Sequence, residues 1–405
     1  MPSSFGKVLS LVPSLGNNNN IIGVFAEGLS SALRQRGLTA EVAYVTEPDF
    51  LPRLFTAAQD PETLIYYTNF FMDLRVTAHQ HFQNARLNDL FPCKTMAFVA
   101  DQPFINFMWE RVGNCHPETL IQVVETAFVP QAQLLQPGLK HFRFCNTPLI
   151  QDKEITNLPH EDRDIDVLIP LGNTVSNPID NLVQQYQSNR EASAVLDAAY
   201  QLMRKPVERP AFDLFNEAFQ QTLNMAFPEF FTRNKNAGFG MLQMLSQLDR
   251  VTRNERRRQL VNALLQDIGD LRIHMVGDFS DIPAAAQPGI QHHGALPADQ
   301  LCDLMGRSKA VVNSHPNLTE CLHERVVNAG AYGCMVISDH TPVLVKELGD
   351  DWVNGTDRSA ASIFDEYDGT KIATMGAETR RRIFDRHLMT HFADDFIAGA
   401  EARWG

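Results

Sequence analysis

The chain of 405 residues is too long for one ordinary hydrophobic core and suits two domains of roughly 150 to 200 residues each. Its 48 acidic and 35 basic residues give a formal charge of −13, which argues against a nucleic-acid partner because phosphate backbones require a basic surface. The six cysteines form no C-x-x-C pair and no apolar run approaches the ~18 residues of a membrane span, so we expect a cytoplasmic protein without zinc or disulfides.

The first half of the chain alternates short apolar runs with amphipathic stretches, which is typical of parallel β-α-β units. The pattern predicts helices at 21–36 and 74–90, and strands at 7–12, 41–45, 63–68, 94–100, 127–130 and 142–145. The loop Gly16 to Asn20 follows the first strand, at the edge of a parallel sheet where ligands bind. Its asparagines are equally typical of a solvated turn.

Asp101 comes directly after the predicted strand 94–100. A carboxylate at that position is well placed to contact a ligand or to act as a general base. The alternative is that Asp101 only caps the following turn.

The polar stretch 151–164 is predicted to be a linker, after which a second β-α-β pattern begins with the apolar run 166–171 and Gly172-Asn173. Residues 178–265 are predicted to be mostly helical. Further strands are expected at 272–276, 290–294, 310–313, 334–338 and 351–355, and helices at 297–306, 320–333, 343–348 and from 359 onward, the last a long helix at 379–404.

Two motifs in this half resemble ligand sites, but neither is predicted to be one. The D-x-D of Asp164 and Asp166 precedes its strand, at the sheet edge away from the expected ligand, so a metal site is not predicted. Arg256, Arg257 and Arg258 are consecutive and therefore splay around a helix, which favours a solvated face over a nucleic-acid patch.

The segment 310–339 is a compact strand, loop, helix and strand, and its loop lies at the ligand edge of the predicted sheet. It follows a strand with Gly277-Asp278 and the sequence HGALPADQL at 293–301, and it contains HERVVNAGAYG at 323–333 before a strand ending in Ser338-Asp339. This succession resembles the C-terminal domain of GT-B glycosyltransferases. The closest likeness is to the CgeB-like group of bacterial glycosyltransferases, whose signature is R-x-F-E-x-x-A-C-G followed by a strand and Asp.

The positions that fall on that signature are Arg325, Ala331, Gly333 and Asp339. Asp101-Gln102-Pro103 looks like the D-x-P of the same family. The resemblance implies a GT-B fold, in which two Rossmann-like α/β domains face each other across a cleft. It gives an acceptor-side domain at 1–155, a nucleotide-sugar-binding domain at 165–385 with a helical segment at 178–265, and a helix at 386–405 that packs back on the first domain.

The implied activity is metal-independent transfer of a sugar from a nucleotide-diphosphate sugar to a protein, glycan or small-molecule acceptor. The resemblance places the donor against Gly172, Asn173, Asn313, Ser314, His315, Thr319, His323 and Asn328. Arg325 and a helix start near Glu320 would stabilise the negative charge on the leaving phosphate. Asp101 would be the base of an inverting reaction, or an acceptor contact in a retaining one.

One position departs from the family pattern. Related enzymes carry a second Glu in an E-x7-E pair, whereas this chain has Glu320 followed by Asn328. An asparagine can hydrogen-bond a sugar hydroxyl but carries no charge. Two alternatives therefore stay open, namely a nucleotide-sugar epimerase or hydrolase on the same fold, and a non-catalytic binding or assembly protein. Arg325 could also pair with a neighbouring Glu on the helix surface, and His315 and His323 could serve as packed hydrogen-bonding residues.

Overall fold

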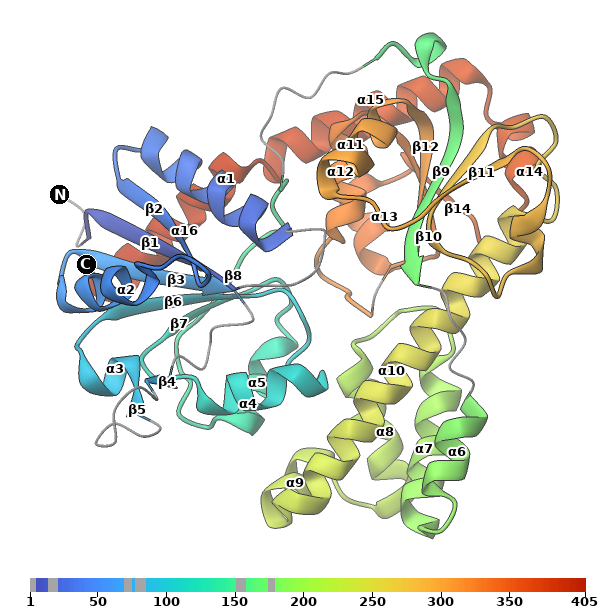
Figure 1. Ribbon diagram of the computed structural model, residues 1–405. Coiled ribbons are helices and arrows are strands. Elements are labelled where there is room, and N and C mark those ends of the chain that lie inside the picture. Colours follow the sequence, from blue (N-terminus) through green and yellow to red (C-terminus); the bar gives the residue numbers. More distant parts are fainter. Residues whose placement is uncertain are drawn as a thin grey trace. The chain divides into compact units, whose positions relative to one another are not determined.

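The computed structural model describes residues 5–13, 21–68, 75–76, 85–150, 158–173, 179–315 and 317–405. Its contacts divide the chain into two compact units, Met1–Asp152 with His387–Gly405, and Lys153–Arg386. Each unit is built on one parallel six-stranded sheet with helices around it (Figure 1).

The first unit has the strand order β2-β1-β3-β6-β7-β8. Its strands are β1 (Lys7–Val12), β2 (Thr39–Tyr44), β3 (Thr63–Thr68), β6 (Lys94–Val99), β7 (Leu120–Val123) and β8 (Phe142–Phe144), and the antiparallel pair β4 (Arg75–Val76) and β5 (Ala85–Arg86) is separate. Its helices are α1 (Ile21–Gln35), α2 (Phe50–Gln59), α3 (Leu87–Leu90), α4 (Asn106–Asn114), α5 (Phe128–Leu135) and α16 (Met389–Trp404).

The C-terminal helix α16 completes the core of the first unit, although it is the last part of the chain. Phe392 of α16 packs edge-on against Phe25 of α1 at a centroid distance of 5.5 Å, and Phe396 packs in the same way on Tyr66 of β3 at 5.1 Å. Arg36 adds an ion pair to Asp394 at 2.7 Å. Such aromatic contacts bury a large apolar area, so the first unit depends on the end of the sequence for its stability.

The second unit has the order β11-β10-β9-β12-β13-β14. Its strands are β9 (Ile165–Asn173), β10 (Ile273–Asp278), β11 (Ile290–His293), β12 (Ser308–Asn313), β13 (Met335–Ser338) and β14 (Trp352–Asn354). The strand order reverses between β9 and β12, which is the topological switch point where open α/β sheets bind their ligands.

The helices of the second unit are of two kinds. An extended helical segment, drawn from green to yellow in Figure 1, comprises α6 (Ile179–Tyr186), α7 (Arg190–Met203), α8 (Ala211–Leu223), α9 (Phe227–Arg233) and the 30-residue α10 (Lys235–Leu264). The helices around the sheet are α11 (Ala298–Gly306), α12 (Glu324–Ala331), α13 (Pro342–Leu348), α14 (Ala360–Glu366) and α15 (Gly369–Arg386), with short turns η1 (His160–Asp162) and η2 (Pro283–Ala286). The C-terminal part of α10 packs on the sheet through Leu260, Val261 and Leu264.

Several predicted elements differ from the structure. The apolar run 127–130 is not a strand but leads into α5, and the strand of this region is β7, because a short apolar run does not by itself distinguish a strand from a buried helix. The described part of 74–90 contains β4, β5 and only a short α3. The predicted helix 379–404 is two helices, α15 and α16. They are separated at buried His387, whose Nδ1 donates a hydrogen bond to Thr147 O (2.7 Å) and whose carbonyl accepts one from the Leu149 N–H (2.6 Å).

The buried guanidinium of Arg163 joins the start of β9 to the end of α12. It donates to the carbonyls of Ser308 (2.7 Å), Tyr332 (2.8 Å) and Gly333 (3.1 Å). By satisfying carbonyl groups at the start of β12 and at the end of α12, the arginine ties the helix to the sheet.

Helix α15 crosses the end of α12 at very short range. A Cβ on Gly376 would lie 2.1 Å from the carbonyl oxygen of Gly333, and one on Gly330 would lie 2.7 Å from a side-chain carbon of Ile383. Both glycines therefore permit a backbone approach that no larger residue allows.

We predict that Gly376→Ala lowers the free energy of unfolding by about 3 kcal/mol, because the added methyl group overlaps a backbone carbonyl that cannot move freely. The matched control is Gly240→Ala in α10, where a Cβ meets nothing within 4 Å. The control should raise the free energy of unfolding by up to about 1 kcal/mol, because alanine is the better helix former. Calorimetric unfolding of both variants checks the prediction, and equal effects would contradict it.

Candidate functional site

The ends of β9 and β12 lie next to each other at the switch point of the second sheet. Gly172 and Asn173 end β9, and in the parallel register they stand opposite Gly277 and Asp278 of β10. Asn313 ends β12, and the next two residues, Ser314 and His315, are buried. These predicted donor contacts therefore share one sheet edge.

The carboxylate of Asp339 holds the loop that leaves β12. It follows β13, the neighbouring strand, and accepts hydrogen bonds from the His315 amide (2.7 Å), the Ser338 hydroxyl (3.2 Å) and the Ser314 hydroxyl (3.4 Å). The Ser338 hydroxyl also accepts from the Asn313 side-chain amide at 3.1 Å. Burial raises the pKa of Asp339 above its usual value, and Arg256 and these donors offset part of the rise.

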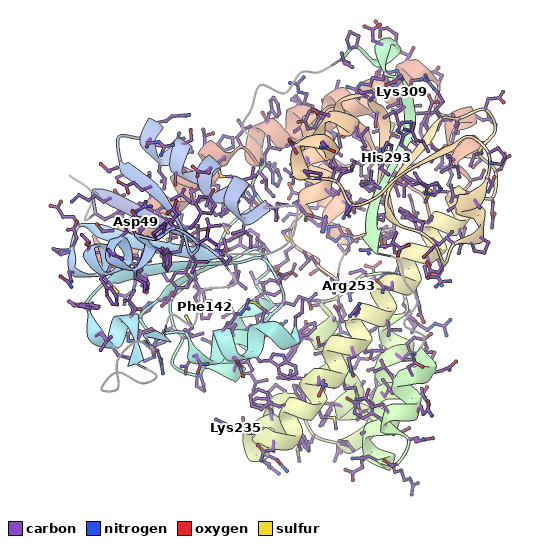
Figure 2. The ribbon with its side chains drawn as sticks, viewed as in Figure 1. Asp49, Phe142, Lys235, Arg253, His293 and Lys309 are labelled. Carbon is purple, nitrogen blue, oxygen red and sulfur yellow. The ribbon has the colours of Figure 1, made fainter. Side chains whose placement is uncertain are left out.

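Helix α10 supplies buried arginines to the same region. Arg256, 7% exposed, donates to Met203 O (3.0 Å) and to the Asn317 side chain, and its Nε lies 3.8 Å from Asp339. The Asn317 amide in turn donates to Asp249, which is fully buried and pairs with Arg253 at 3.0 Å. Figure 2 labels Arg253 on α10.

The expectation that Arg256, Arg257 and Arg258 form a solvated face is therefore wrong. Arg256 is buried, Arg257 is half-buried, and Arg258 pairs with Asp281 at 2.6 Å. The reason is that α10 packs against other elements of the unit, so that Arg256 lies on a buried face of the helix.

Helix α12 begins at Glu324, four residues after the predicted start. His323 is its N-cap, and the His323 Nδ1 accepts a hydrogen bond from the Arg325 amide at 3.2 Å. Thr319 and Glu320 lie in the preceding turn and are half-buried. The turn is held there because Cys321 and Leu322, which follow, are buried.

The side chain of Arg325 points from α12 to the end of β12. Its Nη1 donates to the Asn313 Oδ1 at 3.0 Å. Asn328 lies one turn further along α12, half-buried, and its carbonyl accepts the Tyr332 amide at 3.2 Å. The structure thus brings Asn313, Arg325 and the histidines together, and it places Glu320 off the helix that carries Asn328.

Arg257 lies in a strongly cationic environment. Burial lowers the pKa of its guanidinium to about 10, and the charges of Arg325 and Arg253 act in the same direction, with Asp339 and Glu324 opposing them. A guanidinium whose positive charge is disfavoured by two others is stabilised when an anion binds beside it. The arrangement is therefore suited to a phosphate or diphosphate group.

The first unit carries two carboxylates at its own sheet edge. Asp101, half-buried, lies two residues beyond the end of β6, and Glu125, 1% exposed, lies two residues beyond the end of β7. Because the register pairs Val99 with Val123, the two acids occupy equivalent positions on neighbouring strands. Glu125 was not predicted, although the apolar run before it could have indicated the strand. The predicted loop Gly16 to Asn20 lies outside the described residues.

Two general features of the described residues bear on function. No three His, Cys, Asp or Glu side chains among them gather as they would around a metal ion. Within the same residues, no helix combines the length and the apolar character needed to span a membrane.

Comparison with known proteins links this geometry to a class of enzyme. Residues 253–398 match the family described as "Glycosyl transferase-like", and this segment contains Arg257, Arg325 and Asp339. A search of the curated proteins returned no match.

Several solved structures are similar over nearly the whole chain. An α-glucosyltransferase in complex with UDP and a 13-mer DNA containing a HMU base has a TM-score of 0.53 and 10% identity, with 98% of this chain and 99% of that chain covered. A DNA-modifying β-glucosyltransferase has a TM-score of 0.52 and 10% identity, with 97% and 99% covered. Anabaena HepE in complex with UDP-glucose has a TM-score of 0.47 and 12% identity, with 97% and 98% covered.

The predicted fold class is confirmed: the chain has the α/β GT-B fold, with two parallel sheets. The family match and this fold also support the predicted enzyme class, a glycosyltransferase.

We predict that Arg256→Met lowers the free energy of unfolding by about 3 to 5 kcal/mol, because it leaves Asp339 and Asn317 buried without their cation. Arg233→Met is the control, since Arg233 forms an exposed ion pair with Glu229 within α9 and its loss should change the free energy by less than about 1 kcal/mol. Urea unfolding measures both. A cost for Arg256→Met no larger than that of the control would show that the buried network contributes little.

Proposed function

We propose that the protein transfers a sugar from a nucleotide-diphosphate sugar to an acceptor, with the donor bound at the carboxyl ends of β9 and β12. The observation that carries this proposal is the pair of Arg257 and Arg325, whose charges act on each other, with Arg325 donating to Asn313 at the end of β12, a strand of the switch point. The fold and the family match supply the class of reaction, and the arginines supply the site.

Glycosyl transfer breaks the bond between the anomeric carbon and a phosphate oxygen, and negative charge grows on the leaving diphosphate. Arg257 and Arg325 are placed to stabilise that charge through charge-assisted hydrogen bonds, without a metal ion. The backbone amides at the start of α12 stabilise this negative charge less than the arginines do, because they already have partners. The Arg325 N–H donates to the His323 side chain, and the Val326 N–H donates to the His323 carbonyl. The arginine side chains therefore carry most of the phosphate contact.

The remaining predicted donor contacts have different environments. Asn313, Ser314 and His315 are buried and shape the loop, whereas Thr319, Glu320 and Asn328 are half-buried. We assign to Glu320 and Asn328 the hydrogen bonds to ribose or sugar hydroxyls, which a neutral amide can make as well as a carboxylate. Gly172 and Asn173 end β9, the strand that pairs with β12.

For the acceptor, Asp101 is the candidate base of an inverting reaction, because it follows a strand at the ligand edge of the first sheet. In a retaining reaction Asp101 would instead contact the acceptor.

An epimerase or hydrolase would use the same donor site, but it would consume the nucleotide sugar without any acceptor. Membership of the CgeB-like group rests on Arg325, Ala331, Gly333 and Asp339.

We predict that Arg257→Met and Arg325→Met each weaken UDP binding by about 10- to 100-fold, because each removes a charge-assisted contact to phosphate. Arg381→Met is the matched control, since Arg381 is exposed on α15 and forms ion pairs with Glu378 and Asp385 of the same helix. Isothermal titration with UDP, GDP and ADP gives the affinities. Unchanged binding in both variants would show that the phosphate site lies elsewhere.

We predict that Asp101→Asn reduces the rate of sugar transfer by about 100-fold or more and leaves nucleotide affinity unchanged, since it removes a proton acceptor and not a donor contact. Asp49→Asn, an exposed acid in the same unit, is the control. Mass spectrometry of cell extract incubated with UDP-sugars identifies the acceptor, and nucleotide release then gives kcat and KM. A higher acceptor KM with kcat unchanged would favour the retaining mechanism.

A further inference from the structure

The helix that carries Arg325 starts on a histidine, which is an unusual N-cap. The usual cap residues are Ser, Thr, Asp and Asn, whose oxygen atoms accept a backbone N–H over the physiological pH range. His323 accepts the Arg325 amide through Nδ1, at 3.2 Å. An imidazole nitrogen accepts only when it carries no proton, so this cap exists only while His323 is neutral.

The other contacts of His323 fix its protonation state. Its Nε2 lies 3.0 Å from the Glu324 carboxylate and donates to it, so the neutral ring carries its proton on Nε2 and leaves Nδ1 for the cap. Its backbone N–H donates to the Nε2 of buried His315 at 3.3 Å, which makes a second imidazole an acceptor in the same turn. Neither ring can gain a second proton without breaking a hydrogen bond to the backbone.

The groups that face His323 differ in their effect. Burial lowers its pKa below the ordinary value of 6.5, Arg325 of α12 and Arg257 of α10 act in the same direction, and Glu324 opposes them. The neutral ring is therefore the form that the folded protein favours. Because the folded pKa is lowered, the stability that the cap contributes is complete above the unfolded pKa of His323 and is lost as the pH falls through the lower, folded pKa.

We propose that His323 is a positioning residue for donor binding, whose neutral imidazole holds the first turn of α12 and thereby places Arg325 against Asn313. Protonation of His323 converts Nδ1 from an acceptor into a donor that faces the Arg325 N–H, so the cap is lost and the guanidinium loses its fixed position. Donor affinity is then high at pH 8 and falls on acidification. This inference rests on the proposed function, because it concerns the same phosphate site.

The test uses His323→Asn, since asparagine is a good N-cap that does not titrate. UDP affinity is measured by isothermal titration between pH 8 and pH 5 for the wild type, His323→Asn and His323→Ala. The terminal phosphate of UDP itself titrates at about pH 6, which changes the affinity of every variant. The informative quantity is therefore the difference between the pH profiles of the wild type and His323→Asn. His293→Asn, on the edge strand β11, is the control histidine (Figure 2).

We expect His323→Asn to bind UDP more tightly than His323→Ala at pH 8, because asparagine restores the cap, and to lose about fivefold less affinity between pH 8 and pH 5 than the wild type loses. His323→Ala should bind about fivefold more weakly already at pH 8, and His293→Asn should follow the wild-type profile. Identical profiles for the wild type and His323→Asn, with UDP bound at pH 8, would overturn this inference alone. Failure of the wild type to bind any nucleotide at any pH would overturn the proposed function and this inference with it.

Discussion

The interaction on which the site depends is the approach of Arg256 to the buried carboxylate of Asp339. The arginine comes from the long helix α10, and the carboxylate follows β13, while the loop held between them leaves β12. A buried carboxylate is costly unless a cation and hydrogen-bond donors surround it. Asp339 has both, and the donors are the amide and hydroxyl groups of the loop itself, so the charge that would destabilise the core instead determines the loop conformation.

The buried and half-buried arginines of this region differ in whether a carboxylate neutralises their charge. Arg253 and Arg256 are matched by Asp249 and Asp339, so their charges are largely neutralised inside the unit. Arg257 lies next to Arg325, and its lowered pKa reflects burial and the repulsion of the other guanidinium groups. In the donor site proposed above, arginines already held in place would stabilise a diphosphate without reorganisation during the reaction. A net acidic protein can therefore bind an anion in one local site.

The sequence was sufficient for those features that depend on neighbouring residues. Most buried strands of the two sheets, though not β7, follow from local apolar patterns, as does the position of Asn313 at a strand end. The end of α12 follows from the turn residue Gly333, which has a positive φ. The contacts that define the site do not, because Arg256 and Asn317 are separated by 61 positions. A run of three arginines has the same local pattern on a solvated helix and on a buried one.

The start of α12 shows the same limit at shorter range. A polar turn followed by helical periodicity predicted a helix from Glu320, and no sequence rule selects a histidine as its N-cap. The selection of His323 depends on His315, which accepts its amide, and on Asp339, which orients the His315 backbone.

The matched family segment begins at Arg253 and therefore contains Arg257, Arg325 and Asp339, but it does not contain β9 or most of the helical segment. The family match and the arrangement of charged side chains are independent observations. The match depends on residue types along the chain, whereas the arrangement depends on where the side chains lie in the structure. The matched segment includes Arg257 and Arg325 of the phosphate site proposed above, so the family match and the charge geometry bear on the same part of the chain.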